Sequence, residues 1–271
     1  MTDTATLLCR IADALDRLAP PQPPEADPAT HSTLRWDGAR LTGLAAASPV
    51  PLDRLVGIDP QMLALKRNFA ALARGGEAHD CLLWGARGSG KSALVRSVSH
   101  FAGLAIVEAA ADQLSGLPAL FARLQSIARP FLLFVDDLAF DAGDPAIRAL
   151  RSLLDGGVAA RPANVRMAVT SNHRHLLARE GSDSLARHAR DAADDQLALV
   201  DRFGLVLGFH VPSQDEYLDM VQRHCAPEGL AVDATEALAF ALARGGRSGR
   251  TAWHYRTDLL TRRCQPRGTE A

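Results

Sequence analysis

The sequence predicts an α/β fold in which helices cover both faces of a parallel sheet, followed by a small all-helical subdomain. Three observations predict it. Between about residues 60 and 211, short apolar segments alternate with helical ones, which is typical of a three-layer sandwich around a parallel sheet. Beyond Pro212 only helical periodicity remains. A glycine-rich string at 85–92 separates an apolar segment from a helical one, where a phosphate-binding loop would lie.

Composition limits the classes of protein that this chain can belong to. Of 271 residues, 47% are hydrophobic and 23% are charged, a mixture typical of a soluble globular protein. No apolar run approaches the roughly 18 residues that a membrane-spanning helix needs. The net charge of −1 gives no support to a nucleic-acid surface. The four cysteines are far apart and lack metal-ligand spacing, so we expect a reducing, cytoplasmic location.

The N-terminal region is predicted to be an amphipathic helix on a tether. Residues 1–19 contain apolar side chains at three- and four-residue steps, and residues 20–32 form a proline-rich linker. The apolar side chains of this helix are Leu7, Leu8, Ile11, Leu15 and Leu18. Either this helix is an appendage, or residues 1–18 dock on an unknown protein partner or a neighbouring subunit.

The α/β domain is predicted to span residues 33–211 and to begin with a small hairpin at 33–44. In this hairpin Asp37-Gly38 suits a tight two-residue turn. The apolar segments predict strands at 80–84, 104–108, 131–135, 165–170 and 204–209, and helices at 60–74, 91–102, 118–128 and 145–154. The helical subdomain, here called the lid, is predicted over 212–271, with helices at 214–225, 233–244 and 250–263.

The glycine-rich string matches the phosphate-binding pattern GxxxxGK[ST] at every fixed position. It follows an apolar strand and opens a helix, as the pattern requires. Glycines let backbone N–H groups converge on phosphates, and the helix N-terminus adds positive potential. Lys91 would reach the β- and γ-phosphates of ATP, and the Ser92 hydroxyl would bind Mg²⁺. The predicted nucleotide-binding residues are Gly85, Ala86, Arg87, Gly88, Ser89, Gly90, Lys91, Ser92 and Ala93.

Two acids follow the most apolar segment of the chain. Asp136 comes directly after 131–135, and a buried central strand would carry it to the phosphates. Asp136 would hold Mg²⁺ together with Ser92, and Asp137 would polarise the attacking water. The alternative is that this acid pair forms an Asx turn or caps a helix.

The order of these strings resembles that of the AAA+ ATPases. The strings are LLWGARGSGKS at 82–92, DDL at 136–138, TSN at 170–172, DRFGL at 201–205 and RSGR at 247–250. In detail the chain resembles, over residues 34–263, an uncharacterised bacterial family of AAA+ ATP-binding proteins that carries a conserved domain of unknown function. The resemblance implies a P-loop NTPase fold with a helical lid.

The resemblance also implies roles for single residues on both sides of the phosphate-binding loop. Val56, Gly57 and Ile58 match the segment that packs on adenine in AAA+ proteins, although they could form an ordinary loop. Asn172 matches the sensor residue that follows a strand and reads the γ-phosphate. On chemistry alone, Asn172 could instead cap a following helix.

The resemblance also implies that two arginines outside the phosphate-binding loop contact a nucleotide, one in a neighbouring subunit and one from the lid. Arg202 matches the arginine finger, which reaches the nucleotide of a neighbouring subunit; the alternative is a surface ion pair. Arg250 matches the lid sensor, with Arg247 as the other bearer of this role. The run at 179–199, between the sensor and the finger, is expected to be extended and mobile.

Together these features predict a homo-oligomer, either permanent or formed only with ATP, that hydrolyses Mg·ATP between subunits. Hydrolysis would drive a conformational change in an unknown target. One departure from the general AAA+ pattern is Asp137, where the usual second acid is the longer Glu. The alternative is therefore a nucleotide-dependent switch that hydrolyses ATP slowly or not at all and recruits a partner.

Overall fold

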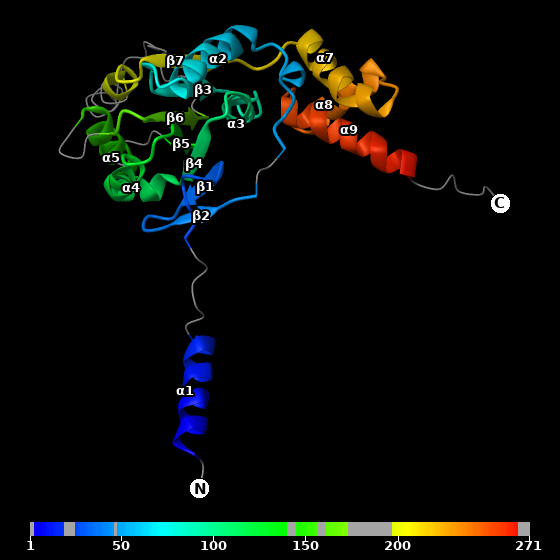
Figure 1. Ribbon diagram of the computed structural model, residues 1–271. Helices are drawn as coiled ribbons and strands as arrows, with labels where there is room; N and C mark the ends of the chain where they lie inside the picture. Colours follow the sequence, from blue (N-terminus) through cyan, green and yellow to red (C-terminus); the bar gives the residue numbers. More distant parts are fainter. Residues whose placement is uncertain are drawn as a thin grey trace, which may run out of the picture.

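A seven-stranded sheet forms the centre of the protein in a computed structural model (Figure 1). The structure describes residues 3–18, 25–45, 48–139, 145–156, 161–172 and 197–264. The strands lie in the order β2-β1-β4-β5-β6-β3-β7. Their bounds are Thr33–Trp36 for β1, Leu41–Gly43 for β2, Cys81–Gly85 for β3, Ala105–Ala109 for β4, Phe131–Val135 for β5, Val165–Ser171 for β6 and Leu205–Phe209 for β7. All neighbours are parallel except β1 and β2, so the predicted α/β fold is confirmed.

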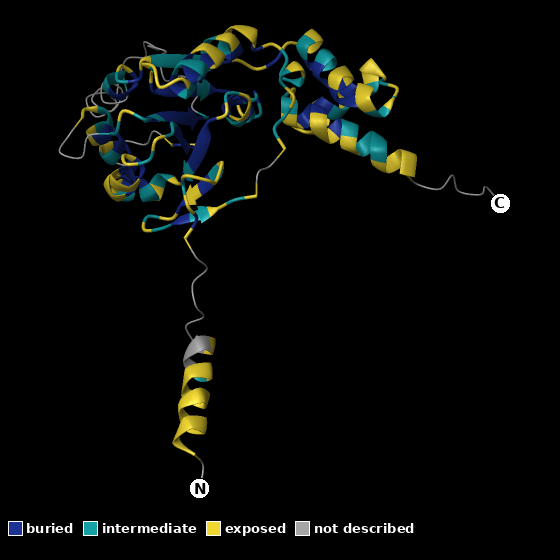
Figure 2. Cartoon of the chain, viewed as in Figure 1, coloured by how far each residue is buried: buried dark blue, intermediate teal, exposed yellow. Residues whose placement is uncertain are grey.

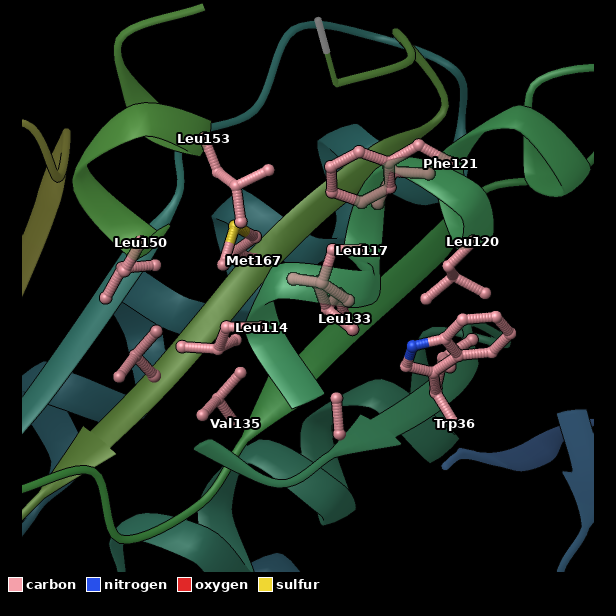
Figure 3. Close-up of a cluster of buried hydrophobic side chains, with 14 of the residues drawn as sticks. Trp36, Leu114, Leu117, Leu120, Phe121, Leu133, Val135, Leu150, Leu153 and Met167 are labelled. Atoms are coloured by element: carbon pink, nitrogen blue, oxygen red, sulfur yellow. The ribbon is translucent and has the colours of Figure 1, made fainter. Parts of the chain in front are cut away.

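Helices cover both faces of this sheet and produce two separate apolar clusters. On one face α2 (Asp59–Ala73) and α3 (Lys91–Phe101) pack; on the other lie α4 (Leu117–Leu124), α5 (Pro145–Leu154) and the 3₁₀ segment η2 (Ala111–Gly116). Alternate residues of β5 point to opposite faces, so Leu133 and Val135 join one cluster whereas Leu132 and Phe134 join the other. Figure 3 shows the cluster under α4 and α5, where Leu133 and Val135 lie with leucines of the helices.

The N-terminal hairpin differs from its prediction at the turn. Trp36 pairs with Leu41, and the Asp37 N–H donates to the carbonyl oxygen of Arg40 at 3.2 Å. The two central residues of the turn are therefore Gly38 and Ala39, not the predicted Asp37 and Gly38. The carboxylate of Asp37 satisfies the loop by accepting hydrogen bonds from the N–H groups of Ala39 and Arg40. Its first strand, β1, pairs in parallel with β4 and so extends the main sheet. Contacts with distant strands, rather than its own turn, decide where it lies.

Beyond the sheet, three helices pack around a cluster of their own. They are α7 (Gln214–Cys225), α8 (Ala234–Ala243) and α9 (Gly249–Cys264), with a 3₁₀ turn, η3, at Ala226–Glu228. Tyr217 and Tyr255 are fully buried between them. Ser213 and Glu216 form a capping box at the start of α7. Figure 2 shows buried residues on these helices, which form one cluster. The boundary of the lid at residue 212 stays a prediction.

The predicted N-terminal helix is α1, Thr4–Leu18, and it stands apart from the rest of the structure in Figure 1. Leu7, Leu8 and Ile11 are exposed on it. Among the described residues, no helix has both the length and the apolarity needed to cross a membrane. Most of the predicted mobile segment, residues 179–196, lies outside the described residues.

Asn164 provides a test of how the sheet and its helices are joined. Its amide donates hydrogen bonds to the carbonyl oxygens of Leu124, Ile127 and Arg129, at 3.0, 3.0 and 3.1 Å. Asn164→Ala removes these bonds and should lower the free energy of unfolding by about 2 kcal/mol. Urea denaturation measures this, with the exposed Gln125→Ala as the control that should change little. Equal stability of the two variants would contradict the assigned role of Asn164.

Candidate functional site

The phosphate-binding string forms a tight loop between β3 and α3. Gly85 and Gly88 have φ values of 130° and 73°, which side chains other than glycine rarely adopt. A Cβ at Gly85 would lie 2.0 Å from the carbonyl oxygen of Phe209 in β7, and one at Gly88 would lie 2.8 Å from Ser248. Both positions therefore require glycine, one for strand packing and the other for the approach of the lid.

Lys91 opens α3 and is 6% exposed. Its ammonium donates to the carbonyl oxygens of Gly85 and Ala86, at 2.9 and 2.8 Å, and to Oδ1 of Asn172, at 3.0 Å. All three acceptors are neutral. Burial lowers the pKa of Lys91 to about 8, although Asp137 and Asp136 act in the opposite direction. A partly buried positive charge thus faces the loop without a carboxylate at hydrogen-bond distance among the described residues.

Asp136 follows β5 and gathers three side chains around its carboxylate. Oδ1 accepts hydrogen bonds from the hydroxyls of Ser92 and Thr170, both at 2.6 Å. Oδ2 lies 3.3 Å from a guanidinium nitrogen of Arg96, which also pairs with Glu108. Oxygen donors of this kind are the ligands that Mg²⁺ prefers, so Ser92 and Asp136 fit this ion.

Asp137 lies next to these groups in an uncommon backbone conformation. Its φ of 57° is the only positive value of a non-glycine residue among those the structure describes. Its backbone N–H donates to the Thr170 hydroxyl at 2.8 Å, and its carboxylate accepts a hydrogen bond from Asn172. Arg87 lies 3.7 Å from the same carboxylate. Asn172 therefore connects Lys91 to Asp137; the segment that it would cap in the alternative interpretation, from residue 173, lies outside the described residues.

A cavity of about 470 Å³ opens beside this network, within the size range of small-molecule sites. Of the predicted nucleotide-binding residues, those that line it are Val56, Ile58, Arg87, Gly88, Ser89, Gly90, Lys91, Ser92 and Ala93. Gly85 and Ala86 are not in the lining, but their carbonyls hold Lys91. Gly57 lines a neighbouring hollow instead, where it lies against Glu216 of α7.

The lid closes one side of the cavity. The N–H of Gly249, at the start of α9, donates to the carbonyl oxygen of Gly88 at 3.0 Å. Arg250 lines the cavity, whereas Arg247 donates to the carbonyl oxygen of Pro212 and is not part of the lining. The position of Arg250, rather than that of Arg247, suits a residue that contacts a bound phosphate.

Arg202 is not brought to this cavity. It forms an ion pair with Asp155, just after α5, and donates to the carbonyl oxygen of Ala198. Asp155 raises the pKa of Arg202, and Arg202 lowers the pKa of Asp155. Within one chain Arg202 therefore has the ion pair that the sequence left open as an alternative. A finger role concerns a neighbouring subunit and stays a prediction.

Several residues in and around the cavity were missed by the sequence analysis. Thr170 was quoted only as part of TSN, and Arg96 was not singled out; both act on Asp136 through contacts between distant segments. From the lid, Met220, His224 and Trp253 reach the cavity. Trp253 is 44% exposed. No motif marks these lid residues, because their place depends on how the lid packs.

The sheet, the loop and the polar network define the fold of an AAA+ P-loop ATPase. The chain belongs to the family described as "Protein of unknown function (DUF815)", which matches residues 29–263. Its fold is similar to that of the RuvB Holliday junction branch migration motor of Thermotoga maritima, with a TM-score of 0.54 and 22% identity over 79% of this chain. A mutant form of the same RuvB gives a TM-score of 0.55 and 21% identity over 79% of this chain. No curated protein matches the chain.

The chain spans about 66% of the length of the first of these RuvB structures and 67% of the second. At this identity the likeness concerns the fold.

The pKa of Lys91 leads to a test of the anion site. Because its pKa is about 8 in the free protein, about half of the molecules are uncharged at pH 8, and a bound phosphate would recharge them. Inorganic tripolyphosphate should therefore bind with proton uptake at pH 8, and its affinity should fall as the pH rises to 9.5. Calorimetry in buffers of different ionisation enthalpy measures the uptake.

The matched control is Lys91→Arg, whose guanidinium stays charged throughout this pH range. It also corrects for protons that tripolyphosphate itself takes up or loses. Equal proton uptake by the wild type and Lys91→Arg would contradict the lowered pKa of Lys91.

Proposed function

We propose that this protein binds Mg·ATP in the cavity between the α/β domain and the lid, and hydrolyses it at an interface between subunits. The observation that carries the proposal is the hydrogen-bonded series that runs from Lys91 through Asn172 to Asp137, with Ser92 and Asp136 beside it. This arrangement provides a cation for phosphate oxygens, oxygen ligands for Mg²⁺, and a carboxylate for water within one cavity.

Each residue of this series has a role in the proposed reaction. Lys91, now bound to neutral oxygens, exchanges them for the more negative β- and γ-phosphate oxygens. Ser92 and Asp136 would hold Mg²⁺, which when bound would offset negative charge on the phosphates. Asp137 accepts a hydrogen bond from the attacking water and orients it. Asn172, which already contacts Lys91 and Asp137, senses the γ-phosphate, and Arg250 contacts it from the lid.

Arg202 is proposed to complete the site of a neighbouring subunit. It lies outside the cavity lining of its own chain, which supports a role in the site of another copy. AAA+ proteins commonly form oligomers, in agreement with this arrangement. RuvB is described as a motor that acts on Holliday junctions. We leave the target of this protein open and do not extend that substrate to it, because the net charge of −1 offers no support for nucleic-acid binding.

A second candidate is a switch that binds ATP, hydrolyses it slowly and recruits a partner through α1. Two observations favour it. Asp137 is shorter than the glutamate that is usual here, and it is engaged by Asn172 and Arg87. The apolar side chains of α1 at Leu7, Leu8 and Ile11 are exposed. In either case we expect the protein to act in the cytoplasm.

Phosphate release from Mg·ATP, measured against protein concentration, separates the two candidates. For shared sites we expect turnover to rise more than linearly with concentration, and Lys91→Ala to give only the blank rate. Arg202→Ala should bind ATP normally but lose at least about 10³-fold in turnover. Tight ATP binding by the wild type without release above the blank would favour the switch.

Mixing two inactive variants tests the shared site directly. Lys91→Ala subunits retain Arg202, and Arg202→Ala subunits retain Lys91, so a mixture contains some complete interfaces and should regain turnover. Arg262→Ala, on the outer part of the lid, is the control and should keep full activity. An oligomer of Arg202→Ala with normal turnover would contradict the finger assignment.

A further inference from the structure

Arg96 reaches Asp136 from outside the cavity of the phosphate-binding loop. It lies on α3 and is not part of the lining of that cavity. Together with Glu108 of β4, it lines a second cavity of about 650 Å³, which shares Val50 and Ala93 with the first. Because Asp136 lines the first cavity, Arg96 acts across the wall between the two. The hydrolysis proposed above assigns it no role.

Three groups hold the guanidinium of Arg96. Its Nε donates to Oε1 of Glu108 at 3.0 Å, and its Nη2 donates to Oδ2 of Asp136 at 3.3 Å. Its central carbon lies 4.9 Å from the centre of the Phe134 ring, over which it packs. The side chains of Arg96 and Asp136 are 40% and 36% exposed, so water can reach this pair. Since one of the three contacts involves Asp136, Arg96 can leave that carboxylate and still have an anionic partner.

The strand register places the two carboxylates on one face of the sheet. Glu108 of β4 is the register partner of Phe134 in β5, so their side chains are neighbours on the same face. Asp136 follows Phe134 by two residues, which brings it back to that face. The guanidinium of Arg96 can therefore move from one carboxylate to the other while it stays over the ring.

The two oxygens of Asp136 differ in what they can still accept. Oδ1 accepts hydrogen bonds from the hydroxyls of Ser92 and Thr170, both at 2.6 Å, which uses its two lone pairs. Oδ2 is the oxygen that Arg96 contacts. Mg²⁺ usually keeps several of its waters, and these waters need an acceptor such as Oδ2. Arg96 occupies part of this oxygen, and its positive charge repels a dication.

We propose that Arg96 is a displaceable counter-ion of the magnesium site: it pairs with Asp136 while no metal is bound, and it withdraws to Glu108 when Mg²⁺ binds. Arg96 thereby sets the Mg²⁺ concentration at which the site fills. It is a positioning residue, since it contacts Asp136 and lies outside the lining of the nucleotide cavity. This inference rests on the proposed function, because it concerns the same Mg·ATP site.

The affinity of a non-hydrolysable ATP analogue, measured by calorimetry at increasing concentrations of free Mg²⁺, tests this inference without turnover. Arg96→Gln removes the competing charge and should lower the half-saturating Mg²⁺ concentration about fivefold. Glu108→Gln removes the second anionic partner of Arg96 and should raise that concentration about threefold. Arg67→Gln is the control and should leave it unchanged, because Arg67 is exposed on α2 and lines neither cavity.

The double variant Arg96→Gln/Glu108→Gln separates displacement from a general effect of charge. If Glu108 acts through Arg96, the double variant should need as little Mg²⁺ as Arg96→Gln alone. If the charges simply add, the two substitutions cancel and the double variant returns to the wild-type value, which would overturn the proposal. At saturating Mg²⁺ every variant should bind the analogue as the wild type does, which reports that the cavity is intact.

The remaining outcomes distinguish this inference from the proposed function. If the wild type binds the analogue with Mg²⁺ but Arg96→Gln needs as much Mg²⁺ as the wild type or more, the counter-ion role is overturned and nucleotide binding stands. If the wild type does not bind the analogue with or without Mg²⁺, the proposed function fails, and this inference fails with it.

Discussion

The site depends on the buried positive charge of Lys91 and on the hydrogen bonds that hold its ammonium group. A charge that is largely removed from water is costly, and here three neutral oxygens are its only described hydrogen-bond partners. Two of them are carbonyls that the loop presents because its glycines adopt positive φ values. The third is the side chain of Asn172, which also holds Asp137. A site built in this way is electrostatically prepared for an anion.

The topology of the sheet makes this arrangement possible. Strands β5, β6 and β3 are parallel neighbours, so their carboxyl ends meet at one edge. Asp136 leaves from the first, Asn172 from the second and Gly85 from the third. Thr170, near the end of β6, then connects the two acids by accepting from the backbone of one and donating to the carboxylate of the other. The chemistry is thus assembled by strand order.

The lid contributes side chains and a backbone contact to the same cavity. It touches the loop backbone through Gly249 and Gly88, so the orientation of α9 and the shape of the loop are physically connected. Arg250 and Trp253 stand on this helix, and both line the cavity. Arg202, in contrast, remains with Asp155 on its own chain. The lid residues thus reach the cavity of their own chain, whereas the proposed finger requires a second chain.

The sequence by itself determined what short-range rules control. Apolar segments predicted the strands from β3 onward, the GxxxxGK[ST] pattern predicted the loop, and the end of the most apolar strand predicted an acid, Asp136, beside the loop. These features depend on residues a few positions apart, whose spacing is visible in the chain. The roles of the site residues go beyond geometry and stay predictions.

Only the tertiary structure decided the pairing of β1 with β4 and the contacts of Thr170 and Arg96 with Asp136. It also decided that Arg250 rather than Arg247 lines the cavity, and that His224 and Trp253 lie there. Each of these facts joins segments far apart in the sequence, and local periodicity carries no information about which distant surfaces will meet. Burial and pairing of polar groups decide that, and they exist only once the chain has folded.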